Sequence, residues 1–395
     1  MPAEFLIFGV TLAGVAIFHR RALPIAAAGL AAVILYEWVF TQFPAGPGFS
    51  GLVTHFAHEW VILTNLLLLL VGFAMLAAHF EQSGLPKALP RYLPDNWTGA
   101  FALLAIVFVI SGFLDNIAGA LIGGAMAHTL FRGKVRVGYL AAIVAASNAG
   151  GAGSVIGDTT TTMMWISGVP PTQVLHAYIA AGAAFLVFGF AAARAQQRFA
   201  PIIKDNEPSL AIDWPRVLIV LFILVSAVAV NIGVNARFPA LADLFPFIGT
   251  AVAAALLISI PLRHPDWSVL PGAVKGSIFL LCLVTSASLM PVDSLPHPSW
   301  QTAFALGFVS SFFDNIPLTA LALKQGGYDW GVLAYAVGFG GSMLWFGSSA
   351  GVAICNMFPE ARSTGRWLRE GWLIAVGYVV GFAALLFALG WHPPG

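Results

Sequence analysis

The sequence predicts an all-α polytopic membrane protein built from two inverted-topology repeats. Two observations lead to this fold class. Hydrophobic residues make up 59% of the chain and charged residues only 9%, which gives a mean hydropathy of +0.87. A short motif also occurs twice, as SGFLDNI at 111–117 and as SSFFDNI at 310–316, in a chain of 395 residues. Because a soluble globule has no interior large enough for this much apolar surface, the chain is expected to lie in a bilayer.

Composition also excludes other classes of protein. The formal net charge is only +1, so nucleic acid is not an expected partner. The two cysteines, Cys282 and Cys355, lie in apolar runs without metal-ligand spacing, and we expect buried thiols. The first apolar run, 5–18, is followed and not preceded by arginines, which favours a retained helix over a signal peptide.

About ten apolar runs are long enough to be transmembrane helices, since a bilayer core requires roughly 20 residues. Their expected bounds are 3–18, 22–42, 58–80, 137–167, 175–197, 215–235, 244–262, 268–290, 331–358 and 370–391. Two further apolar segments, about 100–131 and 300–323, are each interrupted near the middle by Asp-Asn. We expect each to form a re-entrant hairpin with Asp-Asn at its tip, because neither arm is long enough to cross; a straight span is the alternative.

The basic residues support this layout. If each hairpin returns to its side of entry, fifteen of the 18 basic residues fall on one face, two on the other, and Lys275 near a helix start. The fifteen are Arg20, Arg21, Lys87, Arg91, Arg132, Lys134, Arg136, Arg194, Arg198, Lys204, Arg216, Arg263, Arg362, Arg366 and Arg369, and the two are Arg237 and Lys324. The positive-inside rule makes the first face cytoplasmic and puts both termini on the non-cytoplasmic side.

Each half of this layout contains five crossings and one hairpin, so the second half starts on the opposite face. The expected organisation is a first inverted repeat at 1–200, a cytoplasmic linker at 201–214 and a second inverted repeat at 215–395. Inverted repeats place a site at their interface that opens to either side in turn.

The helix after each hairpin is expected to be broken. The segment 137–167 contains SNAGGAGSVIGDTTTTMMW, and 331–358 contains GFGGSMLWFGSSAGVAICN; aligning their Gly-Gly pairs places Asp158 opposite Ser348. Glycine costs ~1 kcal/mol against alanine inside a helix, and clusters of it beside polar residues indicate unwound backbone lining a cavity. For Gly123, Gly124 and Gly189 close helix packing is the preferred interpretation.

These segments define a candidate ion site with several carboxylates and no Lys or Arg expected at the same depth. Its expected members are Asp115, Asn116, Asn148, Asp158, Thr160, Thr161, Asp314, Asn315, Ser342 and Ser348, with Asp115, Asp158 and Asp314 as the charged ligands of the transported ion. Hard oxygen donors favour sodium, lithium or a proton over a soft metal. A proton and a metal cation compete for the same carboxylate, so binding one releases the other. No cofactor is expected.

The quoted motifs resemble those of the NhaD-type sodium/proton antiporters, within the ion-transporter superfamily of arsenite, silicon and dicarboxylate carriers. The resemblance extends from about Leu66 to Leu386, and GDTTTTMMW and GSSAGVA are its most specific parts. It implies sodium or lithium export in exchange for protons by an elevator-like movement, in the bacterial inner membrane, often as a homodimer. By motif position it also assigns the suspected site to Asp115, Asn148, Asp158, Thr160, Thr161, Asp314, Ser342 and Ser348.

Other functions stay open as alternatives. Dicarboxylate carriers of the superfamily usually have Ser-Asn-Thr at the hairpin tips, so Asp-Asn argues against a dicarboxylate, and oxyanion or weak-acid efflux is the second candidate. A membrane hydrolase is not expected, because the chain has no HExxH, no nucleophile elbow and no His near either Asp-Asn. A channel needs a continuous pore, whereas two opposed hairpins suit alternate closure.

The roles of Glu81, Asp293 and His128 are left open, and Glu37 and Glu59 are expected to be solvated at helix ends.

Overall fold

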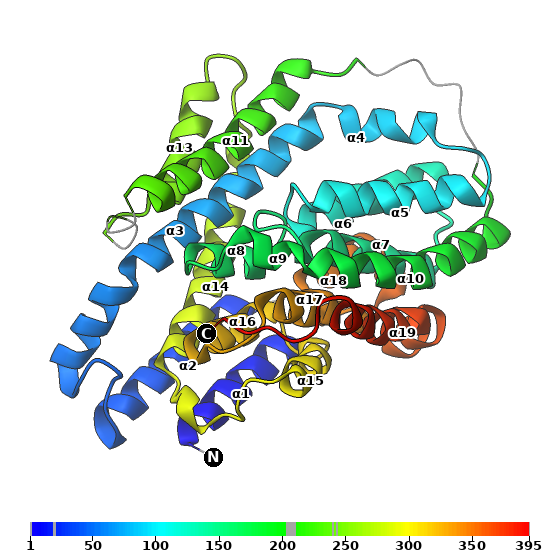
Figure 1. The fold of residues 1–395 in the computed structure, drawn as a ribbon. Helices are drawn as coiled ribbons and strands as arrows, with labels where there is room; N and C mark the ends of the chain where they lie inside the picture. Colours follow the sequence, from blue (N-terminus) through cyan, green and yellow to red (C-terminus); the bar gives the residue numbers. More distant parts are fainter. Residues whose placement is uncertain (1, 19–20, 203–210, 239–240, 242–243, 395) are drawn as a thin grey trace. The chain divides into compact units, whose positions relative to one another are not determined.

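The computed structural model describes all residues except 1, 19–20, 203–210, 239–240, 242–243 and 395. The described residues form helices joined by short connections, with one isolated antiparallel bridge between Phe43 and Gly46 as their only β pairing (Figure 1). Most of the expected linker 201–214 lies outside the described residues, as do Arg20 and Lys204 of the basic-residue count.

The chain divides into two compact units, and both halves of the sequence contribute to each. Unit 1 comprises Met1–His79, Pro215–Pro296 and Ile316–Gly326. Unit 2 comprises Phe80–Trp214, His297–Asn315 and Gly327–Gly395.

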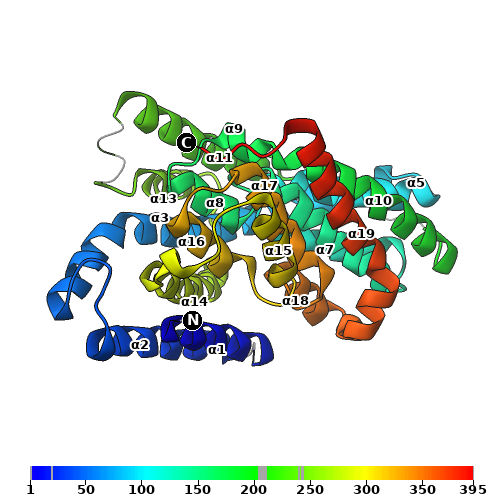
Figure 2. The ribbon, with the colours of Figure 1, turned by 60° about the horizontal axis from the view of Figure 1, so that its bottom comes forward.

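Unit 1 is a set of long apolar helices. They are α1 (Ala3–Ile17), α2 (Ala22–Phe40), α3 (Gly48–Gln82), α11 (Trp214–Arg237), α13 (Phe247–Ser259), α14 (Leu270–Leu289) and α16 (Asn315–Gln325), with the short 3-10 turns η3 (Trp267–Val269) and η4 (Val292–Ser294). Helix α2 packs against both α1 and α14, and Figure 2 shows α1 and α2 side by side. Helices α3 and α13 are joined where the Asn65 side chain accepts a hydrogen bond from the Gly249 amide at 3.0 Å.

Unit 2 holds the shorter and more interrupted helices. They are α4 (Leu85–Ala88), η2 (Leu89–Tyr92), α5 (Trp97–Ser111), α6 (Asn116–Leu130), α7 (Val137–Ala152), α8 (Thr159–Ile166), α9 (Pro171–Leu175), α10 (Ala177–Phe199), α15 (Trp300–Ser310), α17 (Trp330–Gly340), η5 (Gly341–Met343), α18 (Ser349–Met357), η6 (Pro359–Ala361) and α19 (Thr364–Leu389). Every residue of α7 and α17 is buried, so these two helices form the core of the unit. Helix α10 packs along α19 and also contacts α5, α7 and α17.

Six helical stretches among the described residues are long and apolar enough to cross a membrane. They are Ala22–Phe40, Gly48–Gln82, Pro171–Phe199, Trp214–Val234, Trp267–Leu289 and Thr364–Leu389. These correspond to six of the ten expected spans, although α3 begins about ten residues earlier than expected. The runs at 3–18 and 244–262 form the shorter apolar helices Ala3–Ile17 and Phe247–Ser259.

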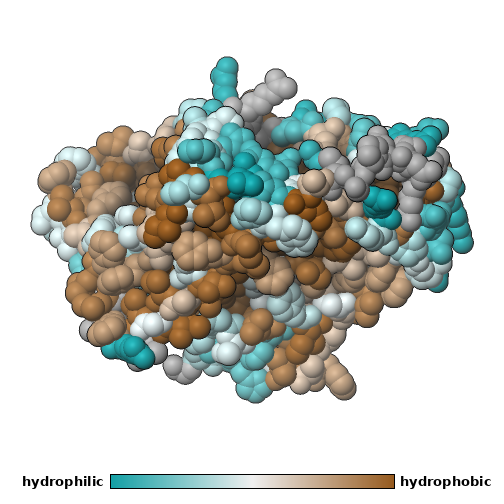
Figure 3. Space-filling view, turned by 90° about the horizontal axis from the view of Figure 1, so that it is seen from above, coloured by the Kyte–Doolittle hydropathy of each residue, from teal (hydrophilic) through white to brown (hydrophobic). Residues whose placement is uncertain are grey.

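Large hydrophobic side chains cover much of the surface. Phe387 is 94% exposed, and Val10, Leu218 and Val225 are each more than half exposed. Figure 3 shows one such face, on which hydrophobic residues predominate. A surface of this kind is stable only against lipid, which agrees with the spans and makes the chain a polytopic membrane protein.

Both Asp-Asn segments are interrupted where the sequence predicted. Helix α5 ends at Ser111 and α6 begins at Asn116, while α15 ends at Ser310 and α16 begins at Asn315. Helices α5 and α6 pack against each other (Figure 1). The polar pair therefore lies at the turn between two short helices in each half of the chain.

The two glycine-rich helices are broken, but later than the glycine pattern indicated. Helix α7 stays helical through Gly150 and Gly151, and its break covers 153–158; the second break lies between η5 and α18. The early glycines instead permit close packing. A Cβ atom on Gly150 would lie 1.9 Å from the Phe108 carbonyl oxygen, and one on Gly340 would lie 2.3 Å from that of Gly307.

The prediction that Glu37 is solvated is wrong. Its side chain is 2% exposed in unit 1, and its Oε2 atom has no hydrogen-bond partner among the described residues. Nearby in the same unit, the Lys324 ammonium donates to the carbonyl oxygens of Ser288 and Met290 at 2.5 and 2.6 Å. Glu37 does lie near the end of α2, which ends at Phe40, but α2 packs against α1 and α14, and hydropathy does not predict such tertiary burial.

Candidate cation site at the helix breaks

The candidate residues predicted from the sequence all lie in unit 2, at the four helix breaks. Eight of them are buried: Asn116, Asn148, Asp158, Thr160, Thr161, Asn315, Ser342 and Ser348. Asp115 and Asp314, at the two Asp-Asn turns, are partly exposed. The structure thus joins positions that are up to 233 residues apart in sequence, from Asp115 to Ser348.

Asp158 is at the centre of the hydrogen-bond network. Its Oδ1 atom accepts from the Thr160 amide at 2.9 Å and from the Thr160 hydroxyl at 3.0 Å, which caps the N-terminus of α8. Its Oδ2 atom accepts from the side-chain amides of Asn116 at 3.1 Å and Asn315 at 3.4 Å. One buried carboxylate therefore receives an amide from each of the two repeated motifs.

Asn148, near the end of α7, connects the two broken helices. Its Oδ1 atom accepts from the Asn116 amide at 3.1 Å. Its Nδ2 atom donates to the hydroxyl of Ser342 at 2.9 Å and to that of Ser348 at 3.2 Å. Ser348 also accepts from the Gly351 amide and caps α18, as Asp158 caps α8.

The two partly exposed carboxylates lie at the turns. Asp115 caps α6 by accepting from the Ile117 amide at 2.6 Å, and Asp314 accepts from the Ser349 hydroxyl at 2.8 Å. Asp115, Asp158 and Asp314 are close enough to interact electrostatically. Within the described part of the chain, neither Asp115 nor Asp158 forms an ion pair with Lys or Arg. The local negative charge is offset by the N-termini of α6, α8 and α18, where helix dipoles are positive.

Thr161 and Ser147 support the backbone of the site. The Thr161 hydroxyl donates to the carbonyl oxygens of Ser154 at 2.5 Å and Asp158 at 2.9 Å, which fixes the break before α8. The Ser147 hydroxyl donates to the Asn116 carbonyl oxygen at 2.6 Å and holds the first Asp-Asn turn against α7. Ser147 was absent from the sequence-based candidates, although its position beside Asn148 was a usable signal. Ser349, which the sequence also places among the hydroxyls of the centre, donates to Asp314.

The donor set of this site is carboxylate, amide and hydroxyl oxygen. No group of three or more His, Cys, Asp and Glu side chains suitable for a metal ion occurs among the residues that the structure describes. Hard oxygen donors with few charges suit a small alkali cation or a proton far better than a transition metal. A buried, polar and multiply capped centre inside an apolar helical unit is typical of a membrane transporter.

Comparison with known proteins assigns the family. Residues 13–340 match the family described as Citrate transporter, and the chain belongs to that family. The chain is 26% identical over 416 residues to the Na(+)/H(+) antiporter NhaD of Vibrio parahaemolyticus, covering 91% of this chain and 98% of that protein. It is also 26% identical to sodium/proton antiporter 1 of Arabidopsis thaliana, covering 99% of this chain and 73% of that protein.

A third relative is the Na(+)/H(+) antiporter NhaD of Alkalimonas amylolytica, which is 25% identical over 98% of this chain and 89% of that protein. The resemblance to NhaD-type antiporters that the motifs indicated is confirmed by these relatives. All three relatives are antiporters by name, and the chain is a multi-pass membrane protein of a transporter family.

Proposed function

We propose that the protein is a secondary active transporter that exchanges sodium or lithium for protons. The observation that carries the proposal is Asp158, a buried carboxylate that accepts hydrogen bonds from Asn116 and Asn315 and from Thr160. A carboxylate in this position holds either a proton or a metal cation, and the two compete. The names of the relatives support sodium and protons as the exchanged ions.

We also propose that Asp115, Asp158 and Asp314 supply the charge that binds the cation, and that the neighbouring amides and hydroxyls complete its coordination. Ser349 donates to Asp314 and releases this bond when a cation takes the carboxylate oxygen. The three aspartates interact electrostatically, so when no cation is bound, protonation of one or more of them replaces the ion's charge. This coupling gives exchange without a cofactor.

The proposed architecture is a pair of inverted repeats, 1–200 and 215–395, with a re-entrant hairpin at each Asp-Asn turn. Matching contacts support it. Gly150 packs on the Phe108 carbonyl oxygen, and Gly340 packs on the Gly307 carbonyl oxygen. The two glycines are 190 residues apart in sequence, and the two carbonyl groups are 199 residues apart. Asp158 and Ser348 occupy corresponding caps of α8 and α18.

An elevator-like movement is the proposed mechanism of alternating access. In this mechanism unit 2 carries the site and moves, and unit 1 is the scaffold, because all candidate ligands belong to unit 2. With fifteen basic residues on the cytoplasmic face, both termini are on the non-cytoplasmic side of a bacterial inner membrane. A homodimer remains a prediction from the family resemblance.

The second candidate is transport of an anion, either a carboxylate such as citrate or an oxyanion or weak acid. The match to the citrate transporter family favours it. The N-termini of α8 and α18 would face such a substrate, since helix N-termini attract anions. The three carboxylates argue against anion transport, because their negative charge would repel the anion. A sodium ion bound together with the anion would have to neutralise that charge.

Proteoliposomes with a preset pH gradient distinguish the two candidates. Sodium, lithium, potassium, citrate and arsenite are added separately, and internal pH is followed with a fluorescent dye. Collapse of the gradient by sodium or lithium alone is the expected result. A response to citrate or arsenite without a response to sodium or lithium contradicts cation/proton exchange and favours the anion carrier.

A further inference from the structure

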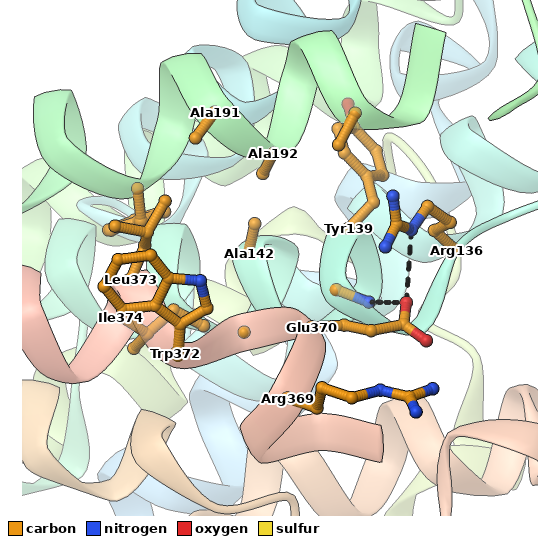
Figure 4. Close-up of a pocket in the computed structure, with 14 residues that line it drawn as sticks. Arg136, Tyr139, Ala142, Ala191, Ala192, Arg369, Glu370, Trp372, Leu373 and Ile374 are labelled. Atoms are coloured by element: carbon orange, nitrogen blue, oxygen red, sulfur yellow. Dashed lines mark hydrogen bonds and ion pairs between the residues drawn. The ribbon is translucent and has the colours of Figure 1, made fainter. Parts of the chain in front are cut away.

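A cavity lies in unit 2, away from the helix breaks, between α7, α10 and α19. Its volume is about 220 Å³. Polar groups gather at one end, where Arg136 precedes α7 and Arg369 and Glu370 lie in the second turn of α19. Figure 4 shows Ala142, Ala191 and Ala192 on the side of the cavity away from these groups. No candidate ligand of the cation site lines it.

The polar end carries excess positive charge. Glu370 accepts from the Arg136 side chain at 3.2 Å and from the Gly138 amide at 3.2 Å, and it pairs with Arg366 at 3.5 Å. Arg369 has no hydrogen-bond or ion-pair partner in the part of the chain that the structure describes. Of these groups, Arg136, Arg369 and Glu370 line the cavity, and their formal charges sum to +1.

The opposite wall is apolar and recessed. The hollow exists because the α10 side chains that line it are small, namely Ala191, Ala192 and Ala195. Phe188 and Ile374, which are buried, also line it. Trp372 lies at the rim and is 58% exposed. Such a cavity suits an amphipathic ligand. The alanine methyl groups would contact its apolar part, the Trp372 indole lies at the rim, and the guanidinium groups would contact its polar part.

The length of α19 gives an expected depth for the cavity. A bilayer core spans roughly 20 helical residues, and a core that ends with α19 at Leu389 begins near Glu370. On this count we expect the arginines at the boundary between hydrocarbon and headgroups, on the face expected to be cytoplasmic, with the alanine wall on the hydrocarbon side. Basic pockets between membrane helices at this level recognise anionic lipid headgroups.

We propose that the cavity formed by Arg136, Arg369, Trp372 and the α10 alanines is a binding site for one anionic phospholipid. The phosphate lies against Arg369 and Arg136, and an acyl chain lies along Ala191, Ala192 and Ala195. Bidentate guanidinium contacts select the phosphate, and the +1 charge of the lining residues favours a net negative headgroup over a zwitterionic one. The site is independent of the transported ion.

Native mass spectrometry of the full-length protein tests this site. Purified protein is incubated with phosphatidylglycerol or with phosphatidylcholine of the same acyl chains, and retained lipid is counted. We expect preferential retention of phosphatidylglycerol, and a reduction of about fivefold in Arg369→Gln, because one arginine near an anionic headgroup contributes ~1 kcal/mol. Ala195→Leu, which fills the cavity without changing charge, should also reduce retention.

Arg91→Gln is the matched control, since Arg91 is an exposed arginine of unit 2 that does not line the cavity. It should retain lipid as the unchanged protein does. Circular dichroism and size exclusion confirm folding of each variant. Equal retention of the two lipids, unchanged retention in Arg369→Gln, or displacement of the lipid by an equal concentration of inorganic phosphate would each overturn the proposal. If the protein is a dimer and Arg369→Gln dissociates it without loss of lipid, the cavity binds a second copy of the chain and not a lipid.

Discussion

At the scale of single residues, the proposed cation chemistry centres on Asp115 and Asp158, which form no ion pair with Lys or Arg among the described residues. Asp158 is held by four hydrogen bonds from three residues, so its position is fixed before an ion arrives. Asp115 and Asp314 are partly exposed, and they accept from the Ile117 amide and the Ser349 hydroxyl, respectively. This difference suits a central ligand flanked by two carboxylates that reach the ion from the turns.

Asp115→Asn and Asp314→Asn should abolish cation-driven proton movement while leaving the fold intact. The amide has the same shape as the carboxylate and removes a charge whose burial costs free energy. Gradient collapse in proteoliposomes, compared with protein-free vesicles, measures activity, and size exclusion measures folding. Normal exchange by either folded variant would show that the charged centre is elsewhere.

Ser348→Ala should weaken exchange without abolishing it. The substitution removes an acceptor for the Asn148 amide and the cap of α18, and loss of a cap costs about 1 kcal/mol. The half-saturating sodium concentration in the same assay should rise. Ser226→Ala is the control, because Ser226 only bonds its own helix on the exposed surface. Complete loss of exchange in Ser348→Ala would make Ser348 an essential ligand.

At the scale of helices, two glycines determine how closely the helices at the site approach. Gly150 and Gly340 occupy corresponding positions and lie against backbone carbonyl oxygens of Phe108 and Gly307. The contact is with backbone, which cannot rotate away. The helix breaks that follow are therefore positioned by packing and by caps together.

Gly150→Ala should lower the melting temperature of the purified protein, because its Cβ atom would lie 1.9 Å from a carbonyl oxygen. Gly182→Ala is the control, since a Cβ atom there meets nothing within 4 Å. Alanine is favoured over glycine by up to ~1 kcal/mol in a helix, so the control should be unchanged or more stable. Equal melting temperatures for the two variants would contradict the packing assigned to Gly150.

At the scale of the whole molecule, the two compact units have different contents. Unit 2 contains all the candidate ligands and every break that carries them, whereas unit 1 is composed mostly of long apolar helices. The proposed elevator-like mechanism, in which unit 2 moves as one body, is based on this division.

Paired spin labels test that movement. One label replaces Lys275 in unit 1 and the other Arg91 in unit 2, and a control pair uses Arg91 and Arg369 within unit 2. Cys282 and Cys355 are first replaced by alanine. Sodium should change the distance distribution of the first pair and leave that of the control pair unchanged. A change confined to the control pair would contradict movement of unit 2 as one body.

Much of the fold and the site follows from sequence, and the failures have physical reasons. The Asp-Asn turns were predictable because two polar residues interrupt apolar runs, and six spans followed from hydropathy. The break after α7 overlaps the predicted glycine cluster, but its first residue could not be predicted, because glycine serves close packing as well as unwinding and sequence does not distinguish the two uses. The bonds from Asn116 and Asn315 to Asp158 could not be foreseen, because they depend on tertiary packing.

The most direct test of cation and proton competition at Asp158 is the number of protons released when sodium binds. Calorimetric titration of the purified protein with sodium, in two buffers of different ionisation enthalpy, yields this number. We expect proton release when sodium binds to the unchanged protein, and no sodium binding to a monodisperse preparation of Asp158→Asn. Sodium binding without proton release, or unaltered binding by Asp158→Asn, would contradict it.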